Sequence, residues 1–168
     1  MHLSALGQAC LVVAIAASPA LAQPAAPVPA PLRNSDVAAA ARWLAGDWRG
    51  TTPKGEAFFE RYRLVNDSTI EQSSHADSTF GAPTERSVVA LRGGTLALEG
   101  NGGKVRWVVV RADETGLHFA PERGATNEFT WAPASGGWNA TMRFRGKDGV
   151  KTVVYQMRRV TTPSSTGR

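Results

Sequence analysis

Three histidines and one cysteine are the side chains of this 168-residue chain best suited to acid–base, nucleophilic or metal chemistry. His118 lies between two apolar residues of an expected strand, so its ring faces the other side, and with Glu60 it would form an acid–base couple. His75 stands among serines and an aspartate, where we expect it to be exposed. His2 falls in the first segment of the chain, so too few histidines remain for a three-histidine zinc site.

Motifs for nucleophilic catalysis or phosphate binding are missing from the sequence. It has no Gly-x-Ser-x-Gly elbow, and its glycine-rich pieces fall in expected hairpin turns rather than ahead of a helix. Cys10 precedes a short apolar run, and removal of that segment would leave no thiol. The residues therefore predict no cofactor and no metal. We favour a non-enzymatic binding protein, with a small enzyme based on His118 and a glutamate as the alternative.

Four side chains on expected strands are candidates for holding a small apolar or amphipathic ligand: Tyr62, Trp107, Tyr155 and Met157. Tyr155 and Met157 alternate along the last strand and so share its apolar face. An internal arginine clamp for a carboxylate is the competing idea. Arg143 alternates with apolar neighbours, however, and arginine is rarely buried completely. We therefore expect Arg143 to point outward.

The elements that must position these side chains are strands. Short segments with strand character are joined by turns rich in Gly, Asn and Asp, at 47–50, 56–65, 68–76, 84–91, 95–99, 104–111, 117–119, 127–132, 138–145 and 150–160. One short helix is expected before them, at 37–42. About ten strands with short turns fit an antiparallel up-and-down barrel, and a sandwich is the rival. A closed sheet of this size is wide enough to enclose a small ligand.

A third function is a packed interaction module of the cell envelope. In the strand at 56–65, one face would carry Phe58, Glu60 and Tyr62, while the other carries Arg61 and is more polar. If Phe58 and Trp138 were exposed, they would form an apolar surface for a partner.

The corner between the helix and the first strand carries the pattern Trp-Leu-x-Gly-x-Trp-x-Gly, which includes Trp43, Gly46 and Trp48. It resembles the N-terminal signature of bacterial lipocalin-like families of unknown function, and more distantly the starts of lipocalins and nitrobindins. The resemblance implies a single calycin-type barrel. It also implies that Trp48 is packed by a basic side chain from near the end of the chain, for which Arg158 and Arg159 are the candidates.

Two features of the related families are absent here. The bacterial families carry a second motif ending His-Asp-Phe-Pro, and the corresponding stretch at 127–130 reads Asn-Glu-Phe-Thr. Nitrobindins carry their haem-ligating histidine in the last strand, and residues 153–156 contain none. Haem is therefore not expected.

The ends of the chain indicate export. Residues 1–22 have a short apolar run followed by Ala-Leu-Ala, which is typical of a cleaved secretory signal. Residues 23–34 are a Pro/Ala-rich linker, 35–160 the barrel domain and 161–168 a disordered tail. The expected location is periplasmic or secreted, with no transmembrane segment after cleavage.

The net charge of +5 does not predict a nucleic-acid partner. The basic residues are spread through the strands with acids among them, and no binding motif accompanies them. A small hydrophobic or amphipathic ligand remains the expected partner, and the sequence leaves the oligomeric state open.

Overall fold

The computed structural model describes residues 31–161. The expected signal peptide (1–22), most of the linker (through 30) and the tail beyond 161 lie outside the described residues. The elements are α1 (Asn34–Leu44), β1 (Gly46–Thr51), β2 (Ala57–Asn66), β3 (Thr69–His75), β4 (Glu85–Arg92), β5 (Thr95–Gly100), the short 3-10 helix η1 (Asn101–Gly103), β6 (Val105–Asp113), β7 (Gly116–Pro121), β8 (Asn127–Ala134), β9 (Gly137–Gly146) and β10 (Gly149–Arg159). The helix therefore starts slightly earlier than the expected domain boundary.

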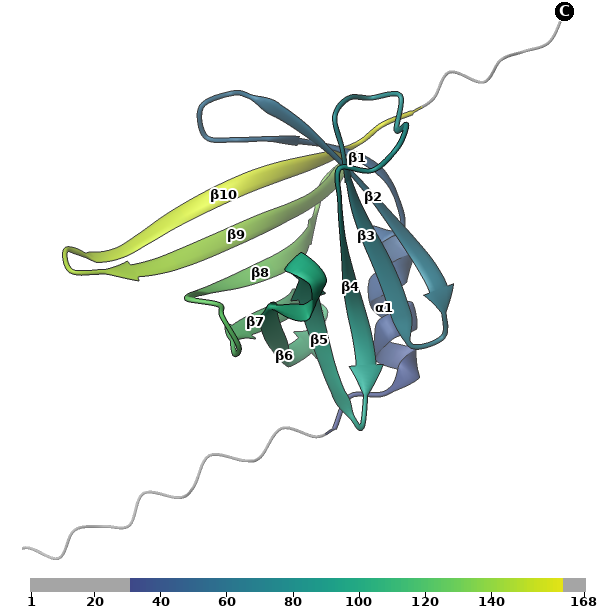
Figure 1. The fold of residues 1–168 in the computed structure, drawn as a ribbon, viewed down its shortest axis with the longest axis vertical. Helices are drawn as coiled ribbons and strands as arrows, with labels where there is room; N and C mark the ends of the chain where they lie inside the picture. The colour runs from purple at the N-terminus through teal and green to yellow at the C-terminus, as the bar shows by residue number, and fades with distance from the viewer. Residues whose placement is uncertain (1–30, 162–168) are drawn as a thin grey trace, which may run out of the picture.

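The strands form one closed antiparallel barrel. Each strand pairs with its neighbours in the sequence, and β10 pairs with β1 to close the sheet. Figure 1 shows the β9–β10 hairpin extending to one side of the barrel, with α1 on the other. The prediction of an up-and-down barrel of about ten strands with a short N-terminal helix is confirmed, and the sandwich alternative is wrong.

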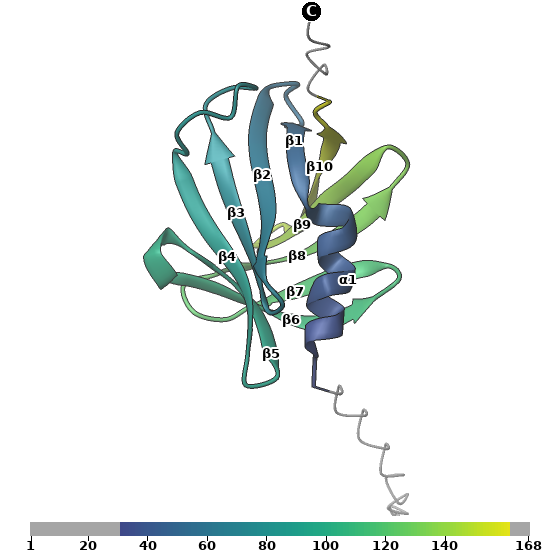
Figure 2. The same cartoon turned by 90° about the vertical axis from the view of Figure 1, so that its right-hand side faces the viewer.

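The helix α1 is held to the barrel by one apolar face. Val37, Ala40, Ala41 and Leu44 are buried at the spacing of a helical stripe. These four side chains belong to the same core cluster as the inward-facing side chains of the strands. Figure 2 shows the helix lying across the strands. The amide of the residue before the helix donates a 2.7 Å hydrogen bond to the carboxylate of Asp36, which fixes the first turn.

The corner after the helix is built around Trp48. Its indole Nε1 donates a 2.6 Å hydrogen bond to the carbonyl of Leu44, and the guanidinium of Arg159 lies 4.5 Å from its ring centroid. Gly46 has a φ of +138°, and a Cβ there would collide with the Arg159 guanidinium. Of the two candidate arginines, Arg159 covers the tryptophan. Arg158 instead donates to the carbonyl of Ser135 at 2.6 Å.

His75 is buried, contrary to the sequence-based expectation. Only 8% of its surface is exposed, although it lies on the outer face of β3. The loop that follows β3 folds back over it: Phe80 packs against the imidazole with ring centroids 5.3 Å apart, and one ring nitrogen lies 3.0 Å from the Gly81 carbonyl. The other nitrogen lies 3.0 Å from the hydroxyl of Ser73. The polar sequence around His75 gave no sign of this cover, which comes from the loop.

Candidate ligand-binding cavity

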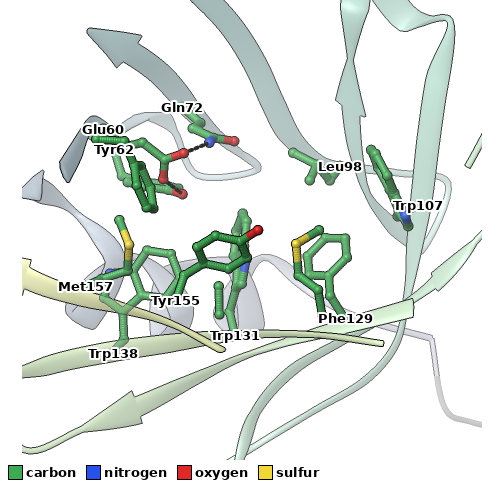
Figure 3. A pocket seen from close by; sticks show the side chains of 13 residues that line it. Glu60, Tyr62, Gln72, Leu98, Trp107, Phe129, Trp131, Trp138, Tyr155 and Met157 are labelled. Carbon is green, nitrogen blue, oxygen red and sulfur yellow. Dashed lines mark hydrogen bonds between the residues drawn. The ribbon is translucent and has the colours of Figure 1, made fainter. Parts of the chain in front are cut away.

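A cavity of about 330 Å³ lies inside the barrel. It is bounded by side chains of β2, β3, β5, β6, β8, β9 and β10, drawn in Figure 3: Phe58, Glu60, Tyr62, Gln72, Leu98, Trp107, Phe129, Trp131, Trp138, Ala140, Met142, Tyr155 and Met157. The four residues expected to bind a ligand, Tyr62, Trp107, Tyr155 and Met157, are all among them. The pleat explains this, because alternate residues of a strand point to the same side of a sheet.

Aromatic rings form much of the cavity wall. Tyr62 lies edge-on to both Trp131 and Trp138, with ring centroids 5.6 Å apart in each pair. Trp131 and Trp138 are 5.5 Å from each other, so the three rings contact one another. Phe58 and Tyr155 make a further edge-on pair at 5.8 Å. Edge-on packing of this kind fixes ring orientation. The wall is therefore preformed rather than loosely packed.

Gly50 makes room for one side of this wall. It lies opposite Phe58 in the β1–β2 ladder, and a Cβ at Gly50 would collide with the Phe58 ring. The ring thus lies directly over the bare backbone of β1 and reaches Tyr155 on β10. Any side chain at position 50 would displace Phe58 toward the cavity.

Phe58 and Trp138 are not exposed, so the interaction surface expected from them is wrong. Trp138 is 1% exposed and Phe58 packs against the core from the cavity side. On β9, Trp138 shares the inner face with Ala140 and Met142, and all three line the cavity. The burial follows from strand register, which one sequence cannot fix.

Glu60 is the acidic group of the cavity. Its carboxylate accepts a 2.7 Å hydrogen bond from the hydroxyl of Tyr62 and a 2.9 Å hydrogen bond from the amide of Gln72, one on each oxygen. Burial raises the pKa of Glu60, and the two hydrogen bonds oppose that rise only in part. Burial together with the Glu60 charge raises the pKa of Tyr62 well above its usual value. The tyrosine is therefore a hydrogen-bond donor at neutral pH.

Other polar atoms of the wall differ in how they are satisfied. The indole Nε1 of Trp107 donates to the Asn127 carbonyl at 2.9 Å. The Trp138 Nε1 is buried and has no hydrogen-bond partner among the described residues. Figure 3 shows the hydroxyl of Tyr155 directed into the space between the walls. The cavity therefore offers isolated polar groups on an apolar surface, the usual composition of a small-molecule site.

His118 and Glu60 are not brought together. His118 lies on the outer face of β7, where Arg111 Nη2 is 2.6 Å from its Nε2 and the Thr130 hydroxyl is 3.2 Å from its Nδ1. Burial, and next the Arg111 charge, lower the pKa of His118. Glu60 faces the interior from β2. The expected acid–base couple is therefore separated by the barrel wall. Arg143 is exposed, as expected from its alternation.

Sequence reasoning missed several residues of the cavity. Gln72 was not singled out, because a single amide in a polar strand carries no signal of its own. Phe129 and Trp131 alternate in the segment at 127–132, and that period could have placed them with the ligand-binding candidates. Glu60 was considered only as a partner for His118, although it shares a predicted face with Tyr62.

Two further hollows, of about 320 and 690 Å³, flank α1 on the outside of the barrel. Their walls include exposed polar residues of the helix and of the β6–β7 turn, without the aromatic wall of the inner cavity. Within residues 31–161, no helix is long and apolar enough to cross a membrane. The same part of the chain contains no group of three or more His, Cys, Asp or Glu placed to hold a metal ion.

A scan against models of known protein families found no match, and a search of curated proteins found none either.

Proposed function

We propose that this protein is exported and binds a small apolar or amphipathic molecule inside its barrel. The observation that carries this proposal is the cavity of about 330 Å³ within a closed sheet, lined mainly by aromatic and aliphatic side chains. Cavities of this size and composition are typical of small-molecule sites, whereas a barrel with a purely structural core fills its interior with side chains. Tyr62, Trp107, Tyr155 and Met157 are the contacts we assign to the ligand.

Relationship to the bacterial lipocalin-like families is part of the same proposal. Its support is the Trp-Leu-x-Gly-x-Trp-x-Gly pattern together with the packing of Arg159 on Trp48 beside Gly46. Export is supported by the signal-like sequence of residues 1–22. A shared fold is a weak guide to function, so the cavity rather than the fold has to be tested.

A dye titration tests the proposed function. Prodan is an uncharged naphthalene dye whose emission shifts to the blue in apolar surroundings. We expect saturable binding of one dye per chain. Ala140 lies in the cavity wall between the register positions of Trp131 and Tyr155. An Ala140→Phe variant fills the space with a ring and should weaken dye binding by roughly 10-fold or more, since about 1.4 kcal/mol of lost contact suffices.

Thr141 provides the matched control for this variant. It is the next residue of β9 and faces the outside of the barrel, opposite Thr130 and Val154. A Thr141→Phe variant adds a ring to the same strand and should bind prodan like the wild type. Thermal unfolding of both variants checks that each is folded. Equal dye binding by Ala140→Phe and the wild type would remove the cavity as the site.

A further inference from the structure

Glu60 has no basic partner inside the barrel. The ion pairs found among residues 31–161 all involve other carboxylates. The two hydrogen bonds to Glu60 come from a phenol and an amide, which are neutral donors. Glu60 is half-buried, and a carboxylate partly withdrawn from water is favourably paired with a cation, because desolvation without pairing is unfavourable. The missing partner is therefore a positive charge.

The aromatic residues near Glu60 suit such a charge. Tyr62, which is bonded to Glu60, contacts Trp131 and Trp138, and all three rings line the same cavity as Glu60. The faces of aromatic rings carry negative potential and attract ammonium groups. A carboxylate beside several such rings is a recognition site for an organic cation. Figure 3 shows the Glu60 carboxyl group facing the same space as the Tyr155 hydroxyl.

An anionic ligand fits this cavity poorly. No lysine or arginine is among the residues that line it. A ligand carboxylate would therefore meet Glu60 without a compensating cation. Figure 3 shows Leu98, Trp107 and Phe129 at the end of the cavity away from Glu60, and Met142 lies opposite Phe129 in the β8–β9 ladder. The lining thus has one acidic end and one apolar end.

We infer that the cavity selects an organic monoamine with an apolar body, whose ammonium group is bound by the Glu60 carboxylate. The Gln72 side-chain carbonyl and the Tyr155 hydroxyl, which belong to the same lining, are the further acceptors that we assign to the ammonium hydrogens. The body of the amine lies against Trp107 and Phe129. This inference rests on the proposed function, because it names the chemical class of the ligand for the same cavity.

Competition between three compounds with one body tests the inference. Phenylbutylamine, phenylbutanol and phenylbutanoate differ only in the head group, and each is titrated against bound prodan at neutral pH. The amine should bind roughly 10- to 100-fold more tightly than the alcohol, as expected for a hydrogen bond to a charged group, and the carboxylate should bind most weakly. Equal affinities for amine and alcohol, or a preference for the carboxylate, would overturn the inference.

A substitution at Glu60 assigns the preference to this residue. In Glu60→Gln the ratio of amine affinity to alcohol affinity should fall from the wild-type value to about 1, whatever the substitution does to the affinity of the alcohol itself. Thermal unfolding shows whether the variant is folded. Glu85→Gln is the matched control, because Glu85 is an exposed acid on β4 that influences Glu60 only through its charge. It should keep the amine preference. An amine preference that survives in Glu60→Gln would contradict the inference.

The pH dependence supplies a second readout. The charged or titratable groups around Glu60 are Tyr62 on its own strand, Glu85 on β4 and Tyr155 on β10, and Arg159 lies beyond Trp48 in the neighbouring ladder. The pKa of Tyr62 is raised well above its usual value, so Tyr62 keeps its proton in the acidic and neutral range. Amine affinity should therefore fall as pH drops through the raised pKa of Glu60, while alcohol affinity stays level. Parallel profiles for amine and alcohol would count against Glu60 as the partner of the ammonium group.

Failure of the inference can be distinguished from failure of the proposed function. If prodan and the alcohol bind in a manner that depends on Ala140, the binding function stands whatever the amine does. If neither prodan nor any of the three compounds binds, the proposed function falls, and the inference falls with it.

Discussion

The guanidinium of Arg159 lies 4.5 Å from the ring centroid of Trp48, at the seam where β10 pairs with β1. Trp48 is buried, and its indole also binds the end of α1. One tryptophan therefore joins the helix, the first strand and the last strand. The seam is the point at which an up-and-down sheet must be held closed.

Replacing Arg159 tests the importance of this contact. An Arg159→Gln variant should lower the free energy of unfolding by about 1 kcal/mol, the usual size of a partly exposed cation–π contact. Urea denaturation measures the change. Arg158→Gln is the control, because Arg158 bonds only a turn carbonyl and should have a smaller effect. Equal losses of stability in the two variants would show that the contact between Arg159 and Trp48 does not stabilise the barrel beyond an ordinary surface interaction.

Adding a methyl group at Gly50 should deform the cavity. Gly50→Ala places a Cβ against the Phe58 ring and forces the ring toward the interior. We expect a loss of about 1–3 kcal/mol in stability, as for other overpacked sites, together with weaker prodan binding. Gly146→Ala in β9 serves as the control, because a Cβ there meets only an ordinary contact at 3.8 Å. A Gly50→Ala variant with normal dye binding would mean that Phe58 does not shape the site.

Glu60 should make the empty protein less stable as pH rises. Burial raises its pKa above the usual 4.5, so the folded state binds a proton more tightly than the unfolded state does. Its contribution is favourable at low pH and is lost as pH rises from 4.5 through the folded-state pKa. Glu60→Gln cannot ionise, so its free energy of unfolding should not fall over this pH range. Relative to the wild type, the variant should therefore become more stable as pH rises from acidic to neutral. Urea denaturation midpoints of both proteins, measured from acidic to neutral pH, test this expectation. The same pH dependence in both proteins would contradict a raised pKa of Glu60.

Asp47 provides a comparison of opposite sign. Its carboxylate accepts hydrogen bonds from Arg61 at 2.5 and 2.7 Å, and these bonds lower its pKa below the usual 3.8. The resulting stability is present above that value and is lost as pH falls through the folded-state pKa. Asp47→Asn should therefore destabilise the protein at neutral pH and have less effect in acid.

The expected signal sequence predicts a defined mature N-terminus. When the full chain is expressed in a bacterium that exports proteins, cleavage after Ala22 should leave Gln23 as the first residue. Intact-mass measurement of the exported fraction checks this. A chain that keeps residues 1–22 and stays with the cytoplasmic fraction would contradict export.

Local patterns in the sequence were sufficient to predict the strands. Turn glycines such as Gly93 and Gly149 separate them, and both adopt a positive φ in hairpins. Alternation correctly placed Tyr62 and Tyr155 on the inner face. These features depend on neighbours along the chain, and one sequence contains that information.

Contacts between segments that are far apart in the chain could not be predicted from local sequence patterns. His75 is covered by a loop, and Trp138 turns inward because of the register of β9. The pairing of Glu60 with Gln72 joins two strands whose alignment depends on the turn between them. A shift of one residue in strand register would exchange the inward-facing and outward-facing side chains. The residues that line the cavity could therefore be assigned only from the structure.

Methionine-methyl NMR tests the central claim most directly. The chain has three methionines. Met1 lies in the expected signal, and Met142 and Met157 both line the cavity. In the exported protein, labelled methyl groups therefore report on the cavity alone. Titration with prodan or phenylbutanol should shift both resonances together and saturably, and Ala140→Phe should move the midpoint of that titration to a roughly 10-fold or more higher ligand concentration. Resonances that stay in place while the ligand is bound would show that binding occurs elsewhere, and the barrel cavity would not be the site.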